Sequence, residues 1–352
     1  MSSEPLELLL SLTSACAVAV AAIFFLRPHA GSLGLLDLPN TRKQHGEAVP
    51  LIGGIGIAFS VSVTGLMLDY DDHAFSAFLV ASLILMITGL LDDRLGLSAN
   101  KRFGVQAVAA LIMVFVAKLV LHDLGDLVGL GAVHPGWFAV PFTVFCVVGL
   151  INALNMADGV DGLAGSLGLV SAAGFGSVAI TLGATQELGL IAVLVGAITG
   201  FLLFNLDHPL RPFRVFMGDA GSNFLGFALV WLAVALTQQD GSALYPISAV
   251  WILGLPIIDT VATMLRRMQL GHSPFKSDRT HLHHLLQARG HSPQSVVVIE
   301  FLLSAALVVA GVASWRLGVA ESVLTLAFVA FAAMYWWVVA RLWRSASASP
   351  GE

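Results

Sequence analysis

Long apolar runs without a charged residue constrain this chain more than any other feature. One of them, LAGSLGLVSAAGFGSVAITL, reaches the length of roughly 20 residues that a helix needs to cross a bilayer. Only 11% of the 352 residues are charged, whereas a soluble domain needs roughly a quarter. Inside a bilayer the backbone must bond to itself, in helices or in a closed barrel. Because barrel strands alternate apolar and polar residues, these runs predict an all-α polytopic membrane protein.

Eleven apolar segments are predicted to be transmembrane helices. They fall at 6–27, 51–69, 75–91, 104–121, 137–155, 162–183, 188–206, 221–238, 246–265, 296–314 and 321–341. The first segment has no basic residue before it and Arg27 after it, so we expect a retained span with the N-terminus outside, not a signal peptide. Eleven spans then put the C-terminus in the cytoplasm. We expect one multi-span domain over 1–341 and a short disordered tail over 342–352.

The distribution of basic residues favours this orientation. With the N-terminus outside, six polar segments face the cytoplasm: 28–50, 92–103, 156–161, 207–220, 266–295 and the tail after 341. Fifteen of the 17 lysines and arginines lie in or beside these segments, which leaves only Lys118 and Arg316 near the outer side. Cytoplasmic segments of membrane proteins carry such an excess. The net charge of −5 gives no support for nucleic-acid binding.

The stretch NALNMADGVDGLAG places four polar side chains between two apolar runs. Two amides and two carboxylates recur at every third position: Asn152, Asn155, Asp158 and Asp161. Gly159 and Gly162 predict that the fifth helix ends here, so that both acids lie on a turn before the sixth span. Ionised groups near a membrane interior usually mark a functional site. A hydrogen-bonding seam between helices is the alternative; it suits the amides, but not two acids with no basic residue nearby.

Three further acids lie at predicted helix ends. Asp92 and Asp93 follow the third span, and adjacent carboxylates favour a bound cation, although pairing with Arg94 is the alternative. Asp219 begins the eighth span among small residues, where a helix N-terminus suits phosphate or a metal. A simple N-cap is the alternative there. The nearby Arg211 and Arg214 favour the phosphate or metal role.

The longest polar segment, RRMQLGHSPFKSDRTHLHHLLQARGHS, combines histidines with arginines. We predict a short helix, capped by Ser277 or Asp278, that ends at Gly290. The HLHH spacing lacks an i, i+4 histidine pair and no cysteine is near, so polyphosphate binding is favoured over zinc. A solvated cluster is the alternative. From this segment the candidate substrate-binding residues are Arg267, Arg279, His281, His283 and His284. We add Lys43 and His45 of the first polar loop, and the amides Asn152 and Asn155.

Acids that hold Mg²⁺ and bases that hold phosphate are the requirements of phosphoryl transfer. Five motifs, in order, resemble those of the polyprenyl-phosphate N-acetylhexosamine-1-phosphate transferases: LDLPNTRKQHGEAVPLIGGI, LLDDR, NALNMADGVDGLAG, VFMGDAGS and SPFKSDRTHLHHL. The resemblance covers nearly the whole chain, and the HLHH form is similar to the branch that uses UDP-GlcNAc. It implies transfer of GlcNAc-1-phosphate from UDP-GlcNAc to undecaprenyl phosphate, releasing UMP, with Mg²⁺ or Mn²⁺.

The resemblance also implies a place and a set of roles. The reaction would be the first membrane step of O-antigen, lipopolysaccharide or related surface-glycan synthesis, at the bacterial inner membrane, with a homodimer left open. Asp92 and Asp93 match paired acids implicated in metal binding and in activating the lipid phosphate, and Asp219 matches a metal ligand. Asp158 and Asp161 match acids needed for catalysis or for placing the sugar nucleotide. The positions assigned to the donor phosphates are matched by Arg267, His281, His283 and His284.

Two other functions are compatible with these residues. The same chemistry with another UDP-N-acetylhexosamine fits the same motifs. A membrane transporter is the alternative of another class; it predicts ionisable residues near the midplane, and only Asp259 lies that deep in a predicted span. For the transferase, we favour direct attack of the lipid phosphate on the β-phosphorus of UDP-GlcNAc, while a two-step route through a phosphorylated aspartate remains an alternative.

Overall fold

A computed structural model describes residues 4–38, 48–67, 72–239, 243–274 and 280–347. About 75% of the chain is helical, which confirms the all-α prediction. The helices are α1 (Glu4–Leu26), α2 (Gly53–Gly65), α3 (Asp72–Leu95), α4 (Ala99–Phe115), α5 (Ala139–Ala157), α6 (Leu163–Leu182), α7 (Thr185–Asn205), α8 (Gly218–Thr237), α9 (Pro246–Ile252), α10 (Gly254–Gln269), α11 (Leu282–Gln287), α12 (Pro293–Arg316) and α13 (Glu321–Ser347). Two short strands, β1 (Leu36–Asp37) and β2 (Val49–Pro50), pair antiparallel.

Within the described residues, eight helices are long and apolar enough to cross a membrane, or nine if α9 and α10 together form one span. This confirms a polytopic membrane protein. Each of the eleven predicted segments contains helix, but α2 has only 13 residues and α4 only 17. The predicted span 246–265 is broken, because α9 and α10 meet at 80°. Pro256 has no N–H to bond the carbonyl of Ile252, which explains the break.

The predicted end of the fourth span, at residue 121, is wrong. Helix α4 ends at Phe115, and Lys118 has a positive φ of 61°. Beyond it the backbone bonds to side chains of other helices: the N–H of Leu121 donates to Thr143 Oγ1, and that of His122 to Gln238 Oε1. An apolar pattern cannot reveal such distant acceptors, so it overestimates the helix.

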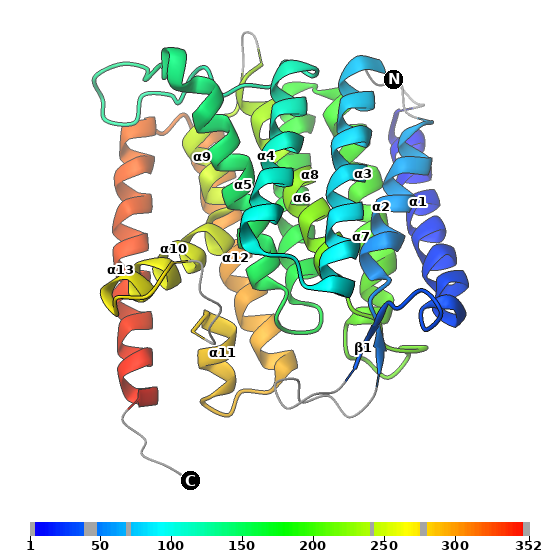
Figure 1. Ribbon diagram of the computed structural model, residues 1–352. Helices are drawn as coiled ribbons and strands as arrows, with labels where there is room; N and C mark the ends of the chain where they lie inside the picture. Colours follow the sequence, from blue (N-terminus) through cyan, green and yellow to red (C-terminus); the bar gives the residue numbers. More distant parts are fainter. Residues whose placement is uncertain (1–3, 39–47, 68–71, 240–242, 275–279, 348–352) are drawn as a thin grey trace.

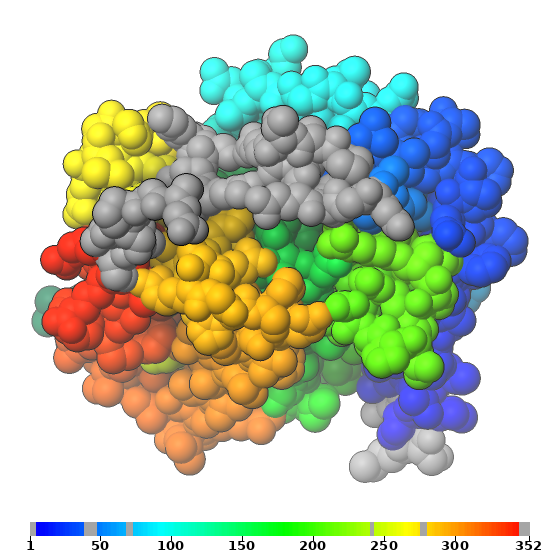
Figure 2. All heavy atoms as spheres, turned by 90° about the horizontal axis from the view of Figure 1, so that it is seen from below, coloured from blue at the N-terminus to red at the C-terminus, as the bar shows by residue number. Residues whose placement is uncertain are grey.

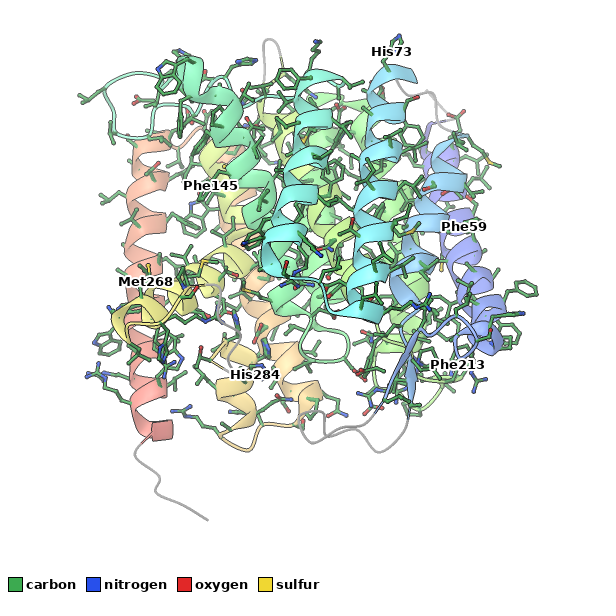
Figure 3. The ribbon with its side chains drawn as sticks, in the orientation of Figure 1. Phe59, His73, Phe145, Phe213, Met268 and His284 are labelled. Carbon is green, nitrogen blue, oxygen red and sulfur yellow. The ribbon has the colours of Figure 1, made fainter. Side chains whose placement is uncertain are left out.

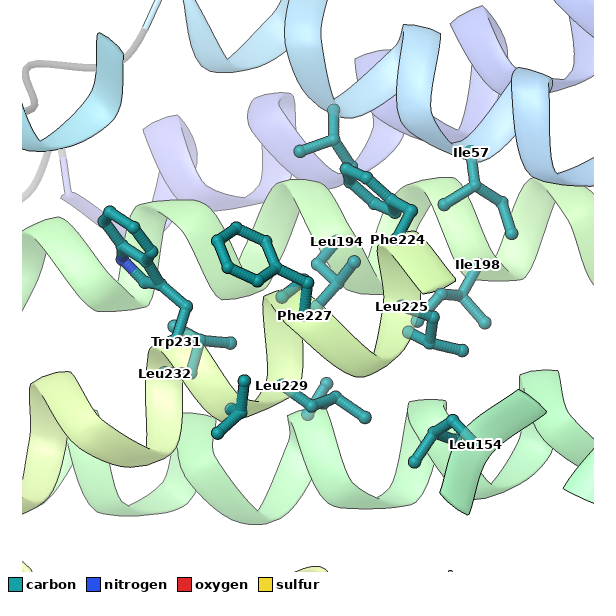
Figure 4. Packing of buried hydrophobic residues seen from close by; sticks show 14 of the residues in the cluster. Ile57, Leu154, Leu194, Ile198, Phe224, Leu225, Phe227, Leu229, Trp231 and Leu232 are labelled. Atoms are coloured by element: carbon teal, nitrogen blue, oxygen red, sulfur yellow. The ribbon is translucent and has the colours of Figure 1, made fainter. Parts of the chain in front are cut away.

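Helix α8 is the centre of the bundle. All of its span is buried, although its mean hydropathy is only 1.6; the spans of α1 and α13 are 17% buried, with values of 2.4 and 2.1. The two least buried spans are thus more apolar than the central one, as expected of helices that face lipid. Figure 4 shows Phe224, Phe227 and Trp231 of α8 packed among side chains of α2, α5 and α7. This packing fixes α8 in the middle of the molecule.

Glycines let the first turn of α8 approach its neighbours closely. A Cβ on Gly54 of α2 would lie 2.2 Å from the backbone nitrogen of Gly221. A Cβ on Gly89 of α3 would lie 2.3 Å from the backbone of Ala220. Small residues allow this kind of backbone contact between membrane helices. Asp219 is therefore held between α2 and α3 by the backbone itself.

The polar segments gather where α13 ends, which we call the lower end of the bundle (Figure 1). Helix α11 and the β1–β2 sheet lie there, whereas α1 begins at the opposite end. Figure 3 places His284 and Phe213 toward the lower end and His73 at the upper one. The two ends of the described chain therefore lie on opposite sides of the bundle.

The contact between α2 and α8 gives a stability test. Gly54→Ala should lower the free energy of unfolding by about 2 kcal/mol, since backbone atoms must move to admit the methyl group. Gly149→Ala in α5 is the control, because a Cβ there meets nothing within 4 Å. Thermal unfolding of the detergent-purified variants measures the difference. Equal stability of the two variants would contradict the packing described here.

Candidate active site

The lower end contains a cavity of about 1170 Å³. Figure 2 shows this face, with the green atoms of the α5–α6 region recessed between the amber and orange atoms of α11 and α12 and the bright green atoms that follow α7. Its polar lining combines acids, amides and cations: Asp37, Asp93, Asn155, Asp158, Asp161, Asn205, Asp207, His208, Arg211, Arg214, Asp219, His284, Gln287 and Gln294. Seven elements far apart in sequence, β1, α3, α5, α7, α8, α11 and α12, therefore contribute to one site.

The predicted turn between the fifth and sixth spans is confirmed. Helix α5 ends at Ala157, and α6 begins after Gly162, whose positive φ of 83° suits a residue without Cβ. The N–H of Gly162 donates to Asn205 Oδ1 at 2.6 Å, and Asn205 Nδ2 donates to the carbonyl of Val215 at 2.8 Å. This buried amide of α7 therefore holds the turn that carries Asp158 into the cavity.

Asp93 and Asp219 meet on one wall of the cavity. The backbone N–H of Asp219 donates to both carboxylate oxygens of Asp93, each at 3.1 Å. Asn155 Nδ2 donates to Asp219 Oδ1 at 2.6 Å and to Ser222 Oγ at 2.9 Å. Gly218 has a φ of 71°, and a Cβ there would lie 2.7 Å from an Asp93 oxygen. The end of α3 thus docks onto the start of α8.

The third acid of this wall is Asp158. Burial, followed by the charges of Asp219, Asp93 and Asp161, raises the pKa of Asp158 to about 8. Carboxylates so close together favour a bound cation, and carboxylate oxygens are the ligands that Mg²⁺ takes. Among the described residues, no three acidic, histidine or cysteine side chains already surround one point as a metal site. The fit of these acids to a divalent cation thus rests on their chemistry and not on a preformed coordination geometry.

Asp161 faces cations on the other side of the turn. Arg214 donates from Nε at 2.6 Å and from Nη2 at 2.9 Å, and Arg211 Nη1 lies 3.6 Å from the same carboxylate. The expectation that these acids have no basic neighbour is therefore wrong for Asp161. Its partners are about 50 residues away in sequence, where a local reading cannot connect them.

Asp92 and Asn152 are predicted site residues that lie outside the cavity lining. Asp92 is 8% exposed and accepts hydrogen bonds from Arg102 Nη1 at 2.9 Å and from the N–H of Leu97 at 2.6 Å. Asn152 donates to Gln106 Oε1 at 2.7 Å, which ties α5 to α4. The structural alternative for the amides thus describes Asn152, while Asn155 reaches the acids.

Helix α11, which we call the histidine helix, packs against the acid turn, residues 158–162. His283 is 1% exposed, and a Cβ on Gly159 would lie 2.3 Å from its Nε2. The His283 ring is stacked on that of His281, with 5.8 Å between the ring centroids, and its centroid lies 4.2 Å from that of His284. Burial, and next His284, lowers the pKa of His283 to about 3, so this ring is neutral. Only His284 of the three lines the cavity.

Asp259 anchors the start of this helix. Its carboxylate accepts from His281 Nδ1 at 2.7 Å, from the N–H of Leu282 at 3.0 Å and from Tyr335 Oη at 2.7 Å. Arg267 is 3% exposed and donates to the carbonyl of Pro274 at 2.7 Å, away from the cavity lining. Both residues thus shape the segment that leads to His284.

The set of predicted residues and the set of lining residues overlap only in part. Lys43, His45 and Arg279 lie outside the described residues, as do the suggested caps Ser277 and Asp278. Asp37, Asn205, Gln287 and Gln294 line the cavity but were not singled out from the sequence. Of these, Asn205 carried a signal in the sequence: it is a polar residue at the end of an apolar run, as are the polar residues of NALNMADGVDGLAG.

Comparison with known proteins identifies the family. A sequence model described as Glycosyl transferase family 4 matches residues 75–237. The undecaprenyl-phosphate alpha-N-acetylglucosaminyl 1-phosphate transferase of Escherichia coli strain K12 is 36% identical over 325 residues, covering 92% of this chain and 89% of that protein. Proteins of the same name from Yersinia pestis (36%, covering 93% and 90%) and Haemophilus influenzae (33%, covering 93% and 92%) are similar. The predicted family is thus confirmed, and the chain belongs to glycosyl transferase family 4.

Proposed function

We propose that this protein transfers GlcNAc-1-phosphate from UDP-GlcNAc to undecaprenyl phosphate, forming undecaprenyl-diphosphate-GlcNAc and UMP. The relatives from Escherichia coli, Yersinia pestis and Haemophilus influenzae are named for this activity. One observation in the structure supports it most: a single cavity has carboxylates on one wall, among them Asp158 and Asp219, and basic side chains elsewhere in its lining, among them Arg214 and His284. Such a site suits two phosphate-bearing substrates.

The division of the cavity suggests a role for each wall. Asp93, Asp158 and Asp219 would hold Mg²⁺ or Mn²⁺, which when bound neutralises charge on the diphosphate. Asn155 would orient Asp219 through their hydrogen bond. Arg211 and Arg214 would orient the donor phosphates, as guanidinium groups do through paired hydrogen bonds. Asp92 would act from behind this wall, by fixing the end of α3.

The proposal includes an orientation in the membrane. The chain would cross the bacterial inner membrane with its N-terminus outside and its lower end in the cytoplasm, α2 and α4 completing eleven segments. Fifteen of the 17 basic residues then lie on the cytoplasmic side. UDP-GlcNAc is a cytosolic nucleotide and the acceptor phosphate lies at the bilayer surface, so a cavity at this boundary is accessible to both.

A transporter remains the rival function, since broken helices such as α9–α10 also occur in transporters. However, the deep carboxylate of Asp259 already accepts three hydrogen bonds from this protein. Purified protein with labelled UDP-GlcNAc, undecaprenyl phosphate and Mg²⁺ distinguishes the two functions. Transfer yields UMP and labelled lipid in equal amounts, whereas uptake into vesicles without UMP would refute the enzyme.

The acid wall predicts a large loss of transfer on neutralisation. Asp158→Asn and Asp93→Asn should each lower kcat/KM by about 100-fold or more, as expected when a group that faces transition-state charge is removed. Glu187→Gln, in the first turn of α7 and outside the cavity lining, is the matched control. Full activity of either aspartate variant, at wild-type expression and thermal stability, would show that these acids do not serve the reaction.

The metal requirement gives an independent test. Removing divalent cations with EDTA should abolish transfer, and added Mg²⁺ should restore it. Asp219→Asn should raise the Mg²⁺ concentration at half-maximal activity by about tenfold or more, the loss typical of a weakened metal site. The measurement is a Mg²⁺ titration of initial rates. Superimposable curves for the variant and the wild type would exclude Asp219 as a ligand.

The contact between the acid turn and the histidine helix predicts sensitivity at Gly159. Gly159→Ala places a methyl group 2.3 Å from Nε2 of the buried His283 ring, so the ring or the acid turn must shift. We expect about a tenfold lower kcat/KM for UDP-GlcNAc with little change in thermal stability. Gly104→Ala, where a Cβ meets nothing within 4 Å, should behave as the wild type. Equal activity of the two variants would argue against this contact.

A further inference from the structure

The last helix, α13, is attached to the histidine segment by specific hydrogen bonds. Tyr335 Oη donates to Asp259, Trp343 Nε1 donates to the carbonyl of Thr280 at 2.8 Å, and Arg289 Nη2 donates to the carbonyl of Leu342 at 2.8 Å. These bonds join α13 to both ends of the segment around α11. Yet α13 stands at the edge of the bundle in Figure 1, and its span is only 17% buried. Lipid anchoring alone does not require such bonds.

Asp259 is the common acceptor at the centre of this arrangement. One carboxylate oxygen accepts from His281 Nδ1, and the other accepts from the N–H of Leu282 and from Tyr335 Oη. His281 is 4% exposed and Tyr335 is 6% exposed. Because water has little access to these donors, loss of the carboxylate leaves them without an equivalent acceptor. The anchor therefore fixes both the His281 ring and the backbone at the start of α11.

The position of His281 is transmitted to the cavity by contact. Its ring stacks on that of His283 with an angle of 6° between the planes, and His283 contacts His284. His283 is also confined by Gly159 of the acid turn. A shift of the anchor therefore moves His284, the member of the segment that lines the cavity. Packed side chains of this kind carry small displacements over several residues.

We propose that Asp259 and Tyr335 are positioning residues, through which α13 holds the His281–His284 segment at the correct distance from the acid turn. Neither residue lines the cavity. Their effect is expected on the donor side of the reaction, since His284 is the residue through which this segment lines the cavity. This inference rests on the proposed function for its kinetic consequences, while the position of α11 is measurable without any activity.

The kinetic test compares three variants with a control on the same helix. Tyr335→Phe should raise the KM for UDP-GlcNAc about three- to tenfold, and Asp259→Asn at least about tenfold, as for hydrogen bonds to a charged group. The KM for undecaprenyl phosphate should change less than twofold. Because Tyr335 acts through Asp259, the double variant should be no worse than Asp259→Asn alone. Trp337→Phe, at a lipid-exposed position of α13 (51% exposed), should match the wild type.

General damage to the fold gives a different result. Fewer folded molecules lower kcat and leave both KM values unchanged. That pattern, or independent effects of the two substitutions that multiply in the double variant, would overturn the positioning role.

A labelling experiment reports the position of α11 directly. In protein whose two cysteines, Cys16 and Cys146, are replaced by alanine, His284→Cys supplies one thiol at the cavity. Its rate of reaction with a water-soluble maleimide should change several-fold when Asp259→Asn or Tyr335→Phe is added, but not with Trp337→Phe. Altered labelling in a protein without transferase activity would leave the positioning role standing and remove the proposed function. Identical labelling rates in all variants would overturn the positioning role itself.

Discussion

The site depends on one close contact, the approach of the first turn of α8 to the end of α3. Gly89 and Ala220 bring the two backbones together, so that the N–H of Asp219 reaches the carboxylate of Asp93. A larger residue at either glycine contact would separate α8 from its neighbours. Backbone packing thus holds two carboxylates side by side, although like charges repel each other. Such an arrangement favours a bound cation.

The two walls of the cavity are supported in different ways. The acids lie at the ends of α3 and α5 and the start of α8, all elements of the central bundle, whose packing leaves little freedom. His284 lies on α11, a helix of six residues that depends on Asp259 and on α13 for its position. A site with one rigid wall and one wall held from the edge suits a reaction in which a donor diphosphate must be fixed during transfer, while substrates and products enter and leave.

Local patterns in the sequence predicted the membrane class, most of the helices and the turn after α5. Apolar length gives helices because lipid leaves the backbone no other partner, and Gly162 marks the turn because only glycine adopts its positive φ readily. The break at Leu253, the short α2 and the end of α4 were missed. The break depends on Pro256, and the start of α2 depends on carbonyls of the segment before α8. The end of α4 depends on acceptor side chains in α5 and just after α8. The pairing of Asp161 with Arg214 likewise needs the fold, since about 50 residues separate them.

We propose that the acid wall and the histidine helix bind one diphosphate between them. A structure of the protein with UDP-GlcNAc and Mn²⁺, with the metal located by its anomalous scattering, tests this claim most directly. We predict the metal within coordination distance of at least two of the carboxylates of Asp93, Asp158 and Asp219, and the donor phosphates between it and His284. A nucleotide bound elsewhere on the molecule, or a metal that contacts none of these acids, would contradict the account.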